Sequence, residues 1–201
     1  SLSATDGGEG LVCEHTLAEL QALDSGGWFD GRFAGEPKPT LGEVFELCRG
    51  RIRLEVHLQD SSVVFMQRVL EEVERFDLLD DVELTTAHYP LLSEIEKLNP
   101  ELRTATFFQE SPKWMPVRLA QRHIVDWADQ LRIAVVHLDL SLITPGFVDD
   151  LHRRGFLVHG AKLDVAEQIE RGLSLGVDQF STGHLAMALQ VRDAFVRSRP
   201  E

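Results

Sequence analysis

The sequence predicts an α/β fold with a parallel sheet, and the alternation of its segments carries this prediction. From Arg51 to the C-terminus, six short apolar segments alternate with six amphipathic ones. Apolar strands that are each followed by an amphipathic helix are typical of a parallel sheet with helices outside it. Two architectures fit this pattern: an open doubly wound sheet, and an eight-stranded (β/α)₈ barrel, which usually needs about 250 residues. A chain of 201 residues with six strands is two βα units short of that barrel.

The first part of the chain is expected to be irregular. Residues 1–39 read as an insertion-like segment, and residues 40–201 as the βα units, so that the whole chain forms a single partial domain. Thr16 and Glu19 have the spacing of a capping box, which predicts a short helix through about Leu23. The stretch that follows is rich in glycine and proline and carries three aromatic side chains expected to anchor it: Trp28, Phe29 and Phe33.

The remaining elements are placed by hydrophobic periodicity and by helix start and stop signals. Thr40 and Glu43 form a second capping box, and Asp60 is expected to cap the next helix. Pro145 suits a first helical turn and Gly155 a helix end. Asp164 and Glu167 are expected to open a further helix. The strands are expected near residues 51–58, 82–86, 102–108, 133–140, 156–161 and 177–181. The helices are expected near 40–49, 60–76, 91–98, 117–131, 144–155, 164–173 and 184–196.

Charge and hydropathy exclude some classes of function. The chain has 20 basic and 33 acidic side chains, a net charge of −13. Nucleic-acid binding needs clustered Lys and Arg, so we do not expect a nucleic-acid partner. A small phosphorylated substrate stays compatible, because a bound divalent cation reverses the local field. No apolar run reaches the roughly 18 residues of a membrane span, and no signal peptide is visible, so we expect a cytoplasmic protein.

Polar residues on the predicted strands mark a candidate site. Glu55 and His57 are two apart and share one face, which in a barrel is the interior. A carboxylate there is costly unless it is paired or bound to metal, so Glu55 is a candidate oxygen ligand for Mg²⁺ or Ca²⁺. The alternative is a polar pair at the mouth of a structural layer.

Other histidines and a lysine lie at predicted strand ends, where parallel α/β folds place their sites. His137 and Asp139 end one strand and share a face, and His159 and Lys162 lie on or just after the next. Together with His88 they predict a polar mouth that receives an anion. Each of them is also compatible with an ordinary hydrogen-bonded rim residue.

Specific motifs then choose between the architectures. The chain reads "DGGEGLV" at 6–12, "ELQALDSGGWF" at 19–29, "FAGEPKPTLGEV" at 33–44 and "LEVHL" at 54–58. In this order they resemble the segment that follows the His-Asp motif of glycerophosphodiester phosphodiesterases. "SLITPGFVDDLHRRGFLVHGAKLD" and "GVDQFSTGHL" resemble later units of the same family. The resemblance implies a (β/α)₈ TIM barrel of the phospholipase-C-like type, without its first two strands in this chain.

The resemblance also implies a chemistry. The family hydrolyses glycerophosphodiesters, in glycerophospholipid metabolism, to glycerol 3-phosphate and an alcohol with a divalent metal. Two histidines act as acid and base, and three carboxylates hold the metal. Only one of these carboxylates has a counterpart here, Glu55, so no catalytic residue is identifiable and the histidines are expected before Ser1. His57, His137 and Lys162 are the expected substrate-binding residues.

Several positions depart from the family pattern. His57 stands where the family has Lys, Ala161 where it has an aromatic, Gly183 where it has Asp, and Thr86-Ala87 where it has Ser-Phe. These departures support an alternative: a catalytically inactive relative that binds a phosphoester or a protein partner. A barrel lacking two strands has open edges, so the isolated chain is also expected to self-associate.

Overall fold

The computed structural model describes residues 8–198, so the first two residues of the 6–12 motif lie outside the described part. The chain divides into two compact units, Ser1–Ile52 and Arg53–Glu201. None of the helices in the described part has the length and apolar character that a membrane crossing requires.

The first unit is built from short helices joined by irregular chain. Both predicted capping boxes are present: the backbone N–H of Glu19 donates to Thr16 Oγ1, and that of Glu43 donates to Thr40 Oγ1. The three aromatic side chains that were expected to anchor this stretch are exposed instead. Their rings contact only along the chain, Trp28 with Phe29 and Phe29 with Phe33. The elements are η1 (Val12–Glu14), α1 (Leu17–Gln21), η2 (Gly31–Phe33) and α2 (Leu41–Cys48).

The second unit is a single parallel sheet of six strands in sequence order, β1 to β6. The strands are β1 (Leu54–His57), β2 (Val82–Thr85), β3 (Arg103–Phe108), β4 (Val135–Asp139), β5 (Leu157–Ala161) and β6 (Gln179–Phe180). The helices are α3 (Val63–Arg75), α4 (Tyr89–Leu98), α5 (Val117–Leu131), α6 (Pro145–Arg153), α7 (Ala166–Leu175) and α8 (Leu185–Ser198), with η3 (Leu140–Leu142) after β4.

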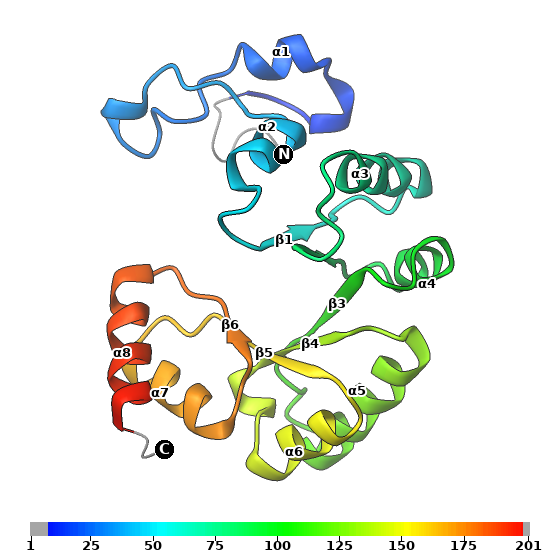
Figure 1. Ribbon diagram of the computed structural model, residues 1–201, viewed down its shortest axis with the longest axis vertical. Helices are drawn as coiled ribbons and strands as arrows, with labels where there is room; N and C mark the ends of the chain where they lie inside the picture. The colour runs from blue at the N-terminus through cyan, green and yellow to red at the C-terminus, as the bar shows by residue number, and fades with distance from the viewer. Residues whose placement is uncertain (1–7, 199–201) are drawn as a thin grey trace. The chain divides into compact units, whose positions relative to one another are not determined.

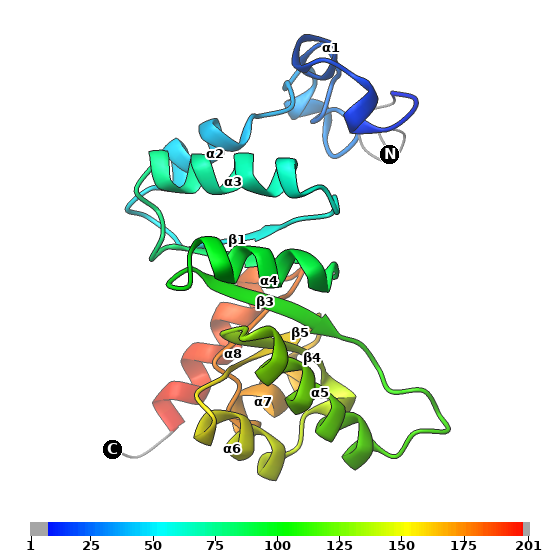
Figure 2. The ribbon, with the colours of Figure 1, turned by 90° about the vertical axis from the view of Figure 1, so that its right-hand side faces the viewer.

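Each strand is followed by a helix, as the alternation predicted, and the helices lie around the outside of a curled sheet (Figures 1 and 2). Strand order equal to chain order, with all neighbours parallel, is the topology of a (β/α)₈ barrel rather than of a doubly wound sheet, whose order reverses at a switch point. The fold is therefore a partial TIM barrel, as the resemblance implied.

Packing of the helices decides which side chains face the lumen. Val136 and Leu138 of β4, and Val158 of β5, belong to the main apolar cluster with side chains of α5 and α6. Because successive strand residues point to opposite faces, His137 and His159 are turned to the lumen. On β1 the same alternation leaves Glu55 and His57 exposed on one face.

Local signals failed at three places. Ser62, not Asp60, is the N-cap of α3; the Asp60 carboxylate accepts from the Ser62 backbone N–H instead. Asp164 does not cap α7, whose N-cap is Val165. The Asp164 carboxylate accepts from the Gly183 backbone N–H instead. In both cases a nearby loop amide captures the carboxylate. The last strand is also shorter than expected, at two residues.

Candidate functional site

A group of polar side chains meets inside the curled sheet, and we call it the lumen cluster. Its members come from five of the six strands and are therefore far apart in sequence. Its members are Glu55, Glu83, His137, His159 and Gln179.

Glu83 is the centre of the lumen cluster. The residue is 8% exposed, and its two carboxylate oxygens contact different neighbours. Oε1 lies 2.7 Å from His137 Nε2, and Oε2 accepts from Gln179 Nε2 at 3.1 Å. Burial alone raises the pKa of this carboxyl, but the hydrogen bond and attraction of His137, together with Gln179 and His159, outweigh burial and hold the pKa below its usual range. Glu83 is therefore ionised at neutral pH and acts only as an acceptor.

His159 lies on the face of the His137 ring. The two rings are stacked, with centroids 3.9 Å apart and planes 15° from parallel. The Gln179 amide nitrogen, which has only donors, lies 3.2 Å from His159 Nδ1, so Nδ1 accepts and the ring proton is on Nε2. Burial, and then the neighbouring His137, lower the pKa of His159 to about 4, against an opposing effect of Glu83. His159 is thus a neutral donor at physiological pH.

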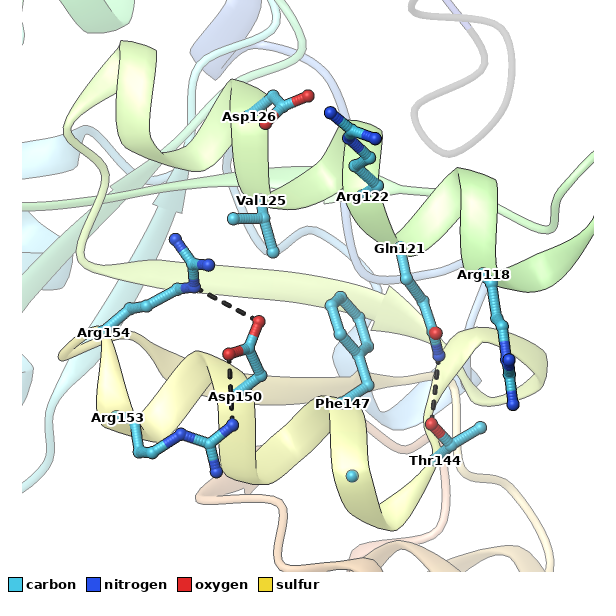
Figure 3. Close-up of a pocket in the computed structure, with 11 residues that line it drawn as sticks. Arg118, Gln121, Arg122, Val125, Asp126, Thr144, Phe147, Asp150, Arg153 and Arg154 are labelled. Carbon is cyan, nitrogen blue, oxygen red and sulfur yellow. Dashed lines mark hydrogen bonds and ion pairs between the residues drawn. The ribbon is translucent and has the colours of Figure 1, made fainter.

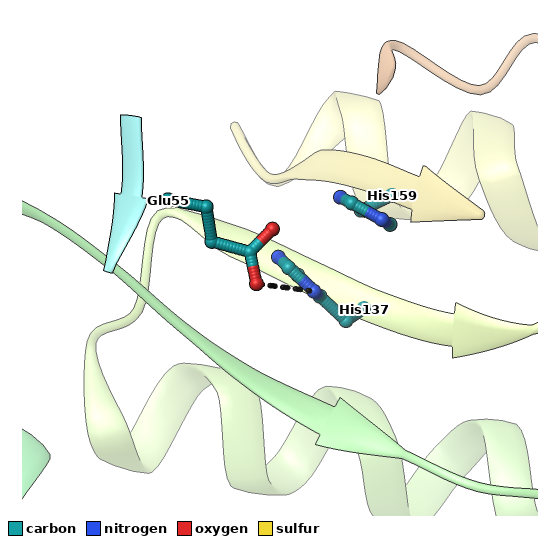
Figure 4. A group of neighbouring side chains, drawn as sticks. All are labelled: Glu55, His137 and His159. Carbon is teal, nitrogen blue, oxygen red and sulfur yellow. Dashed lines mark ion pairs between the residues drawn. The ribbon is translucent and has the colours of Figure 1, made fainter. Parts of the chain in front are cut away.

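Glu55 closes the cluster from β1, and its side chain is 36% exposed. Its Oε1 accepts from Thr85 Oγ1 at 3.3 Å and lies 4.0 Å from His137 Nδ1 (Figure 4). Glu55, His137 and His159 each place one potential ligand atom within 4.8 Å of the others, a group that could hold a metal ion. Glu55 is the residue that the sequence predicted as a metal ligand, and nitrogen donors lie beside it.

The other predicted site residues lie outside the lumen cluster. His57 is exposed and contacts the Phe107 ring, at 5.0 Å between centroids, and Phe107 in turn contacts His137 at 5.0 Å. Lys162 is exposed just after β5, with its backbone in the left-handed region at φ 56°. Asp139 accepts from Ser141 as the cap of η3. Of the three expected substrate-binding residues, only His137 is in the cluster.

Sequence reasoning missed Glu83 and Gln179. Both sit in short segments that were identified as strands from their apolar neighbours, and no local pattern marks either side chain. The available signal was a charged residue between Val82 and Leu84, where a buried strand offers it no local partner.

A larger cavity of the described chain lies elsewhere. It is a groove of about 710 Å³ between α5 and α6, on the outside of the barrel (Figure 3). Four arginines line it, and two of them, Arg153 and Arg154, pair with Asp150 at 3.2 Å. A cavity beside the lumen cluster is smaller, about 210 Å³. Glu55, Glu83, His159 and Gln179 line it together with residues at the amino ends of β1 to β3, among them Arg53, Asp81 and Arg103. Chemistry that needs buried, oriented groups belongs to the lumen.

Fold and site together define the class: a TIM-barrel protein with an anionic, metal-capable lumen. A family model described as the glycerophosphoryl diester phosphodiesterase family matches residues 1–187. The chain belongs to this family, whose members are phosphoric diester hydrolases, and the resemblance stated from the motifs is confirmed.

Individual relatives agree with this assignment. A glycerophosphodiester phosphodiesterase from Caldanaerobacter subterraneus subsp. tengcongensis is 25% identical over 188 residues, which cover 90% of this chain and 73% of that protein. A second, from Bacillus altitudinis, is 23% identical over 197 residues, which cover 96% of this chain and 78% of that protein.

Among solved structures, a phosphodiesterase from Oleispira antarctica in complex with the product sn-glycerol-3-phosphate superposes with a TM-score of 0.77 at 21% identity, covering 96% of this chain and 76% of that one. A glycerophosphodiester phosphodiesterase from Agrobacterium tumefaciens gives a TM-score of 0.72 at 20% identity, over 96% of this chain and 77% of that one. These similarities support the barrel fold.

Proposed function

We propose that this chain is the body of an enzyme that hydrolyses glycerophosphodiesters to glycerol 3-phosphate and an alcohol, with a divalent cation held in part by Glu55. The observation that carries the proposal is the Glu55 carboxylate, held by Thr85 at the lumen 4.0 Å from an imidazole nitrogen. Family membership and the product complex of the Oleispira antarctica phosphodiesterase support this substrate class.

The residues present fit a cation. Glu55 supplies a carboxylate that is partly open to the lumen, and the Thr85 hydroxyl limits its rotation. A divalent cation would supply charge neutralisation for the phosphoryl oxygens. His57 and Lys162 would add donors for those oxygens at the strand ends, and His137 would hold Glu83 through their hydrogen bond. The family's two catalytic histidines have no counterpart among the motifs matched in this chain.

The departures from the family pattern support a second candidate, a relative that binds phosphoesters without hydrolysing them. Gly183, where the family has Asp, has no side chain and so presents no carboxylate of its own; its backbone N–H donates to Asp164 at 2.8 Å. Ala161 likewise leaves the pocket without an aromatic wall. This candidate predicts phosphoester binding without turnover.

The first experiment is to sequence the native coding region upstream of Ser1. In-frame His-Arg-Gly, Glu-x-Asp and His-Asp motifs would support the enzyme, and glycerol 3-phosphate release from glycerophosphocholine would then be measured with and without chelator.

We expect Glu55→Ala to lower kcat/KM at least about 100-fold, since it removes a metal ligand. Glu101→Ala, at an exposed turn, is the matched control and should match the wild type. Chelator-resistant turnover, or full activity of Glu55→Ala, would contradict the proposal.

Three further expectations belong to the same proposal. The whole chain acts as one partial barrel domain, with residues 1–39 as an insertion-like segment. The protein is cytoplasmic.

The 201-residue chain alone self-associates, because β1 and β6 each lack a neighbour on one side within the described sheet. Light scattering on a purified sample measures this, and a monodisperse monomer would count against it.

A further inference from the structure

His137 lies between the carboxylates of Glu55 and Glu83. Ionised Glu83 can only accept, so His137 Nε2, 2.7 Å away, donates this hydrogen bond. The other ring nitrogen, Nδ1, takes no part in it and lies 4.0 Å from Oε1 of Glu55.

The separation of these two atoms suits two ligands of one ion. At 4.0 Å they are too far apart for a hydrogen bond to each other. Ligand nitrogen and oxygen atoms sit about 2.0–2.2 Å from a transition-metal ion. Two such ligands at ordinary bond angles are therefore about 3 Å apart, a separation that the partly exposed Glu55 side chain reaches by a small rotation.

His159 does not fit as a ligand to the same ion. A metal binds an imidazole in the plane of its ring, and stacked rings whose planes are 15° from parallel cannot both contain one ion. The hydrogen bond from Gln179 also occupies Nδ1 of His159 and leaves the proton on Nε2. The group of three thus separates into two ligands and one donor.

We propose that His137, through Nδ1, is a metal ligand beside Glu55, and that Glu83 is the positioning residue that fixes the His137 tautomer. A carboxylate bonded to the far nitrogen of a ligating histidine is a recurring way to orient the ring. A mixed nitrogen and oxygen donor set selects Zn²⁺ or a similar ion over Mg²⁺ and Ca²⁺, which prefer oxygen alone. The inference rests on the proposed function only in taking Glu55 as a ligand.

Metal binding to the 201-residue chain tests the inference without an activity assay. Co²⁺ would be titrated while its ligand-field absorption is recorded, and Zn²⁺ and Mg²⁺ affinities would be measured by calorimetry. His137→Phe and His159→Phe are matched variants, since each keeps a flat ring and removes both nitrogens. We expect His137→Phe to weaken Zn²⁺ binding at least about 100-fold and His159→Phe to weaken it less than about threefold. Glu83→Gln should weaken Zn²⁺ binding by about 10–100-fold.

Removing His137 leaves Glu83 buried without its partner, so His137→Phe could fail to fold. In that case the double variant His137→Phe, Glu83→Leu, which removes the orphaned charge, is compared with Glu83→Leu alone. Loss of Zn²⁺ binding on going from the single to the double variant supports the inference.

Four results would separate the two proposals. Mg²⁺ or Ca²⁺ binding that needs Glu55 but not His137 overturns the inference and leaves the proposed function standing. Equal losses of Zn²⁺ affinity in His137→Phe and His159→Phe also overturn the inference. A proton that stays on His137 Nδ1 in ¹⁵N NMR of the Zn²⁺-loaded chain overturns the inference and leaves the proposed function standing. Zn²⁺ bound through His137 without phosphodiester hydrolysis by the native protein supports the inference and counts against the proposed function.

Discussion

The lumen cluster and the arginine groove both gather charged side chains, yet they differ in burial. Glu83 in the lumen and Asp150 in the groove each accept hydrogen bonds from two side chains. The Glu83 side chain is 10% exposed and that of its partner His137 is 1%, whereas Asp150 is 36% and its partners Arg153 and Arg154 are 68% and 43%. The two carboxylates therefore have the same number of partners, but the groove carboxylate is far more exposed to water than the lumen one.

The difference shows why pairing alone does not mark a site. In the groove, water competes with each ion pair and screens it, so side chains are free to exchange partners. In the lumen, an unpaired group costs its full desolvation energy, so each proton and lone pair has a defined place. A defined place is what catalysis or metal binding requires.

The largest expected effect is that of removing Glu83. Glu83→Ala leaves the His137 Nε2–H and the Gln179 amide without acceptors in a buried site, and we expect a loss of about 3–5 kcal/mol in the free energy of unfolding. Chemical denaturation of the 201-residue chain, followed by circular dichroism, measures it. A loss below about 1 kcal/mol would mean that water replaces the carboxylate, and the contrast with the groove would fail.

The pH dependence of stability is the second test. The folded pKa of His159, about 4, lies below its unfolded value of 6.5, so between these values the unfolded chain binds more protons. Stability should therefore be full above pH 6.5 and fall as the pH drops toward 4, by up to about 3 kcal/mol from this group. His159→Phe should flatten that part of the profile. An unchanged slope in this variant would show that the stacked His159 is not a buried neutral base.

The smallest effect is expected in the groove. Asp150→Ala removes a carboxylate with as many partners as Glu83, but we expect a change of at most about 1 kcal/mol, because the pairs are exposed. The change should also shrink in high salt. Denaturation at low and high ionic strength measures both. A salt-independent loss close to that of Glu83→Ala would remove the distinction between the two regions.

Most of the fold was predictable because its signals are local. Apolar periodicity placed the helix at 117–131 where α5 lies, and both threonine capping boxes formed as expected. Where several nearby groups compete for one carboxylate, local reasoning failed, as at Asp60 and Asp164, since the winner depends on loop geometry. The barrel itself came from the resemblance of the motifs, because six βα units alone also suit an open sheet.

The sequence by itself determined the βα alternation, the family, and Glu55 as a lumen carboxylate. Only the tertiary structure decided what Glu55 faces. Glu83 and His137 are 54 residues apart and lie on strands that are not neighbours in the sheet, yet the curl of the sheet brings them within 2.7 Å. It likewise sets Gln179 against Glu83, whereas His159 stacks on His137 because the two are paired residues of the neighbouring strands β4 and β5. Strand periodicity tells which face a side chain takes, but sheet curvature sets which side chains meet across the lumen, and curvature is a property of all six strands together.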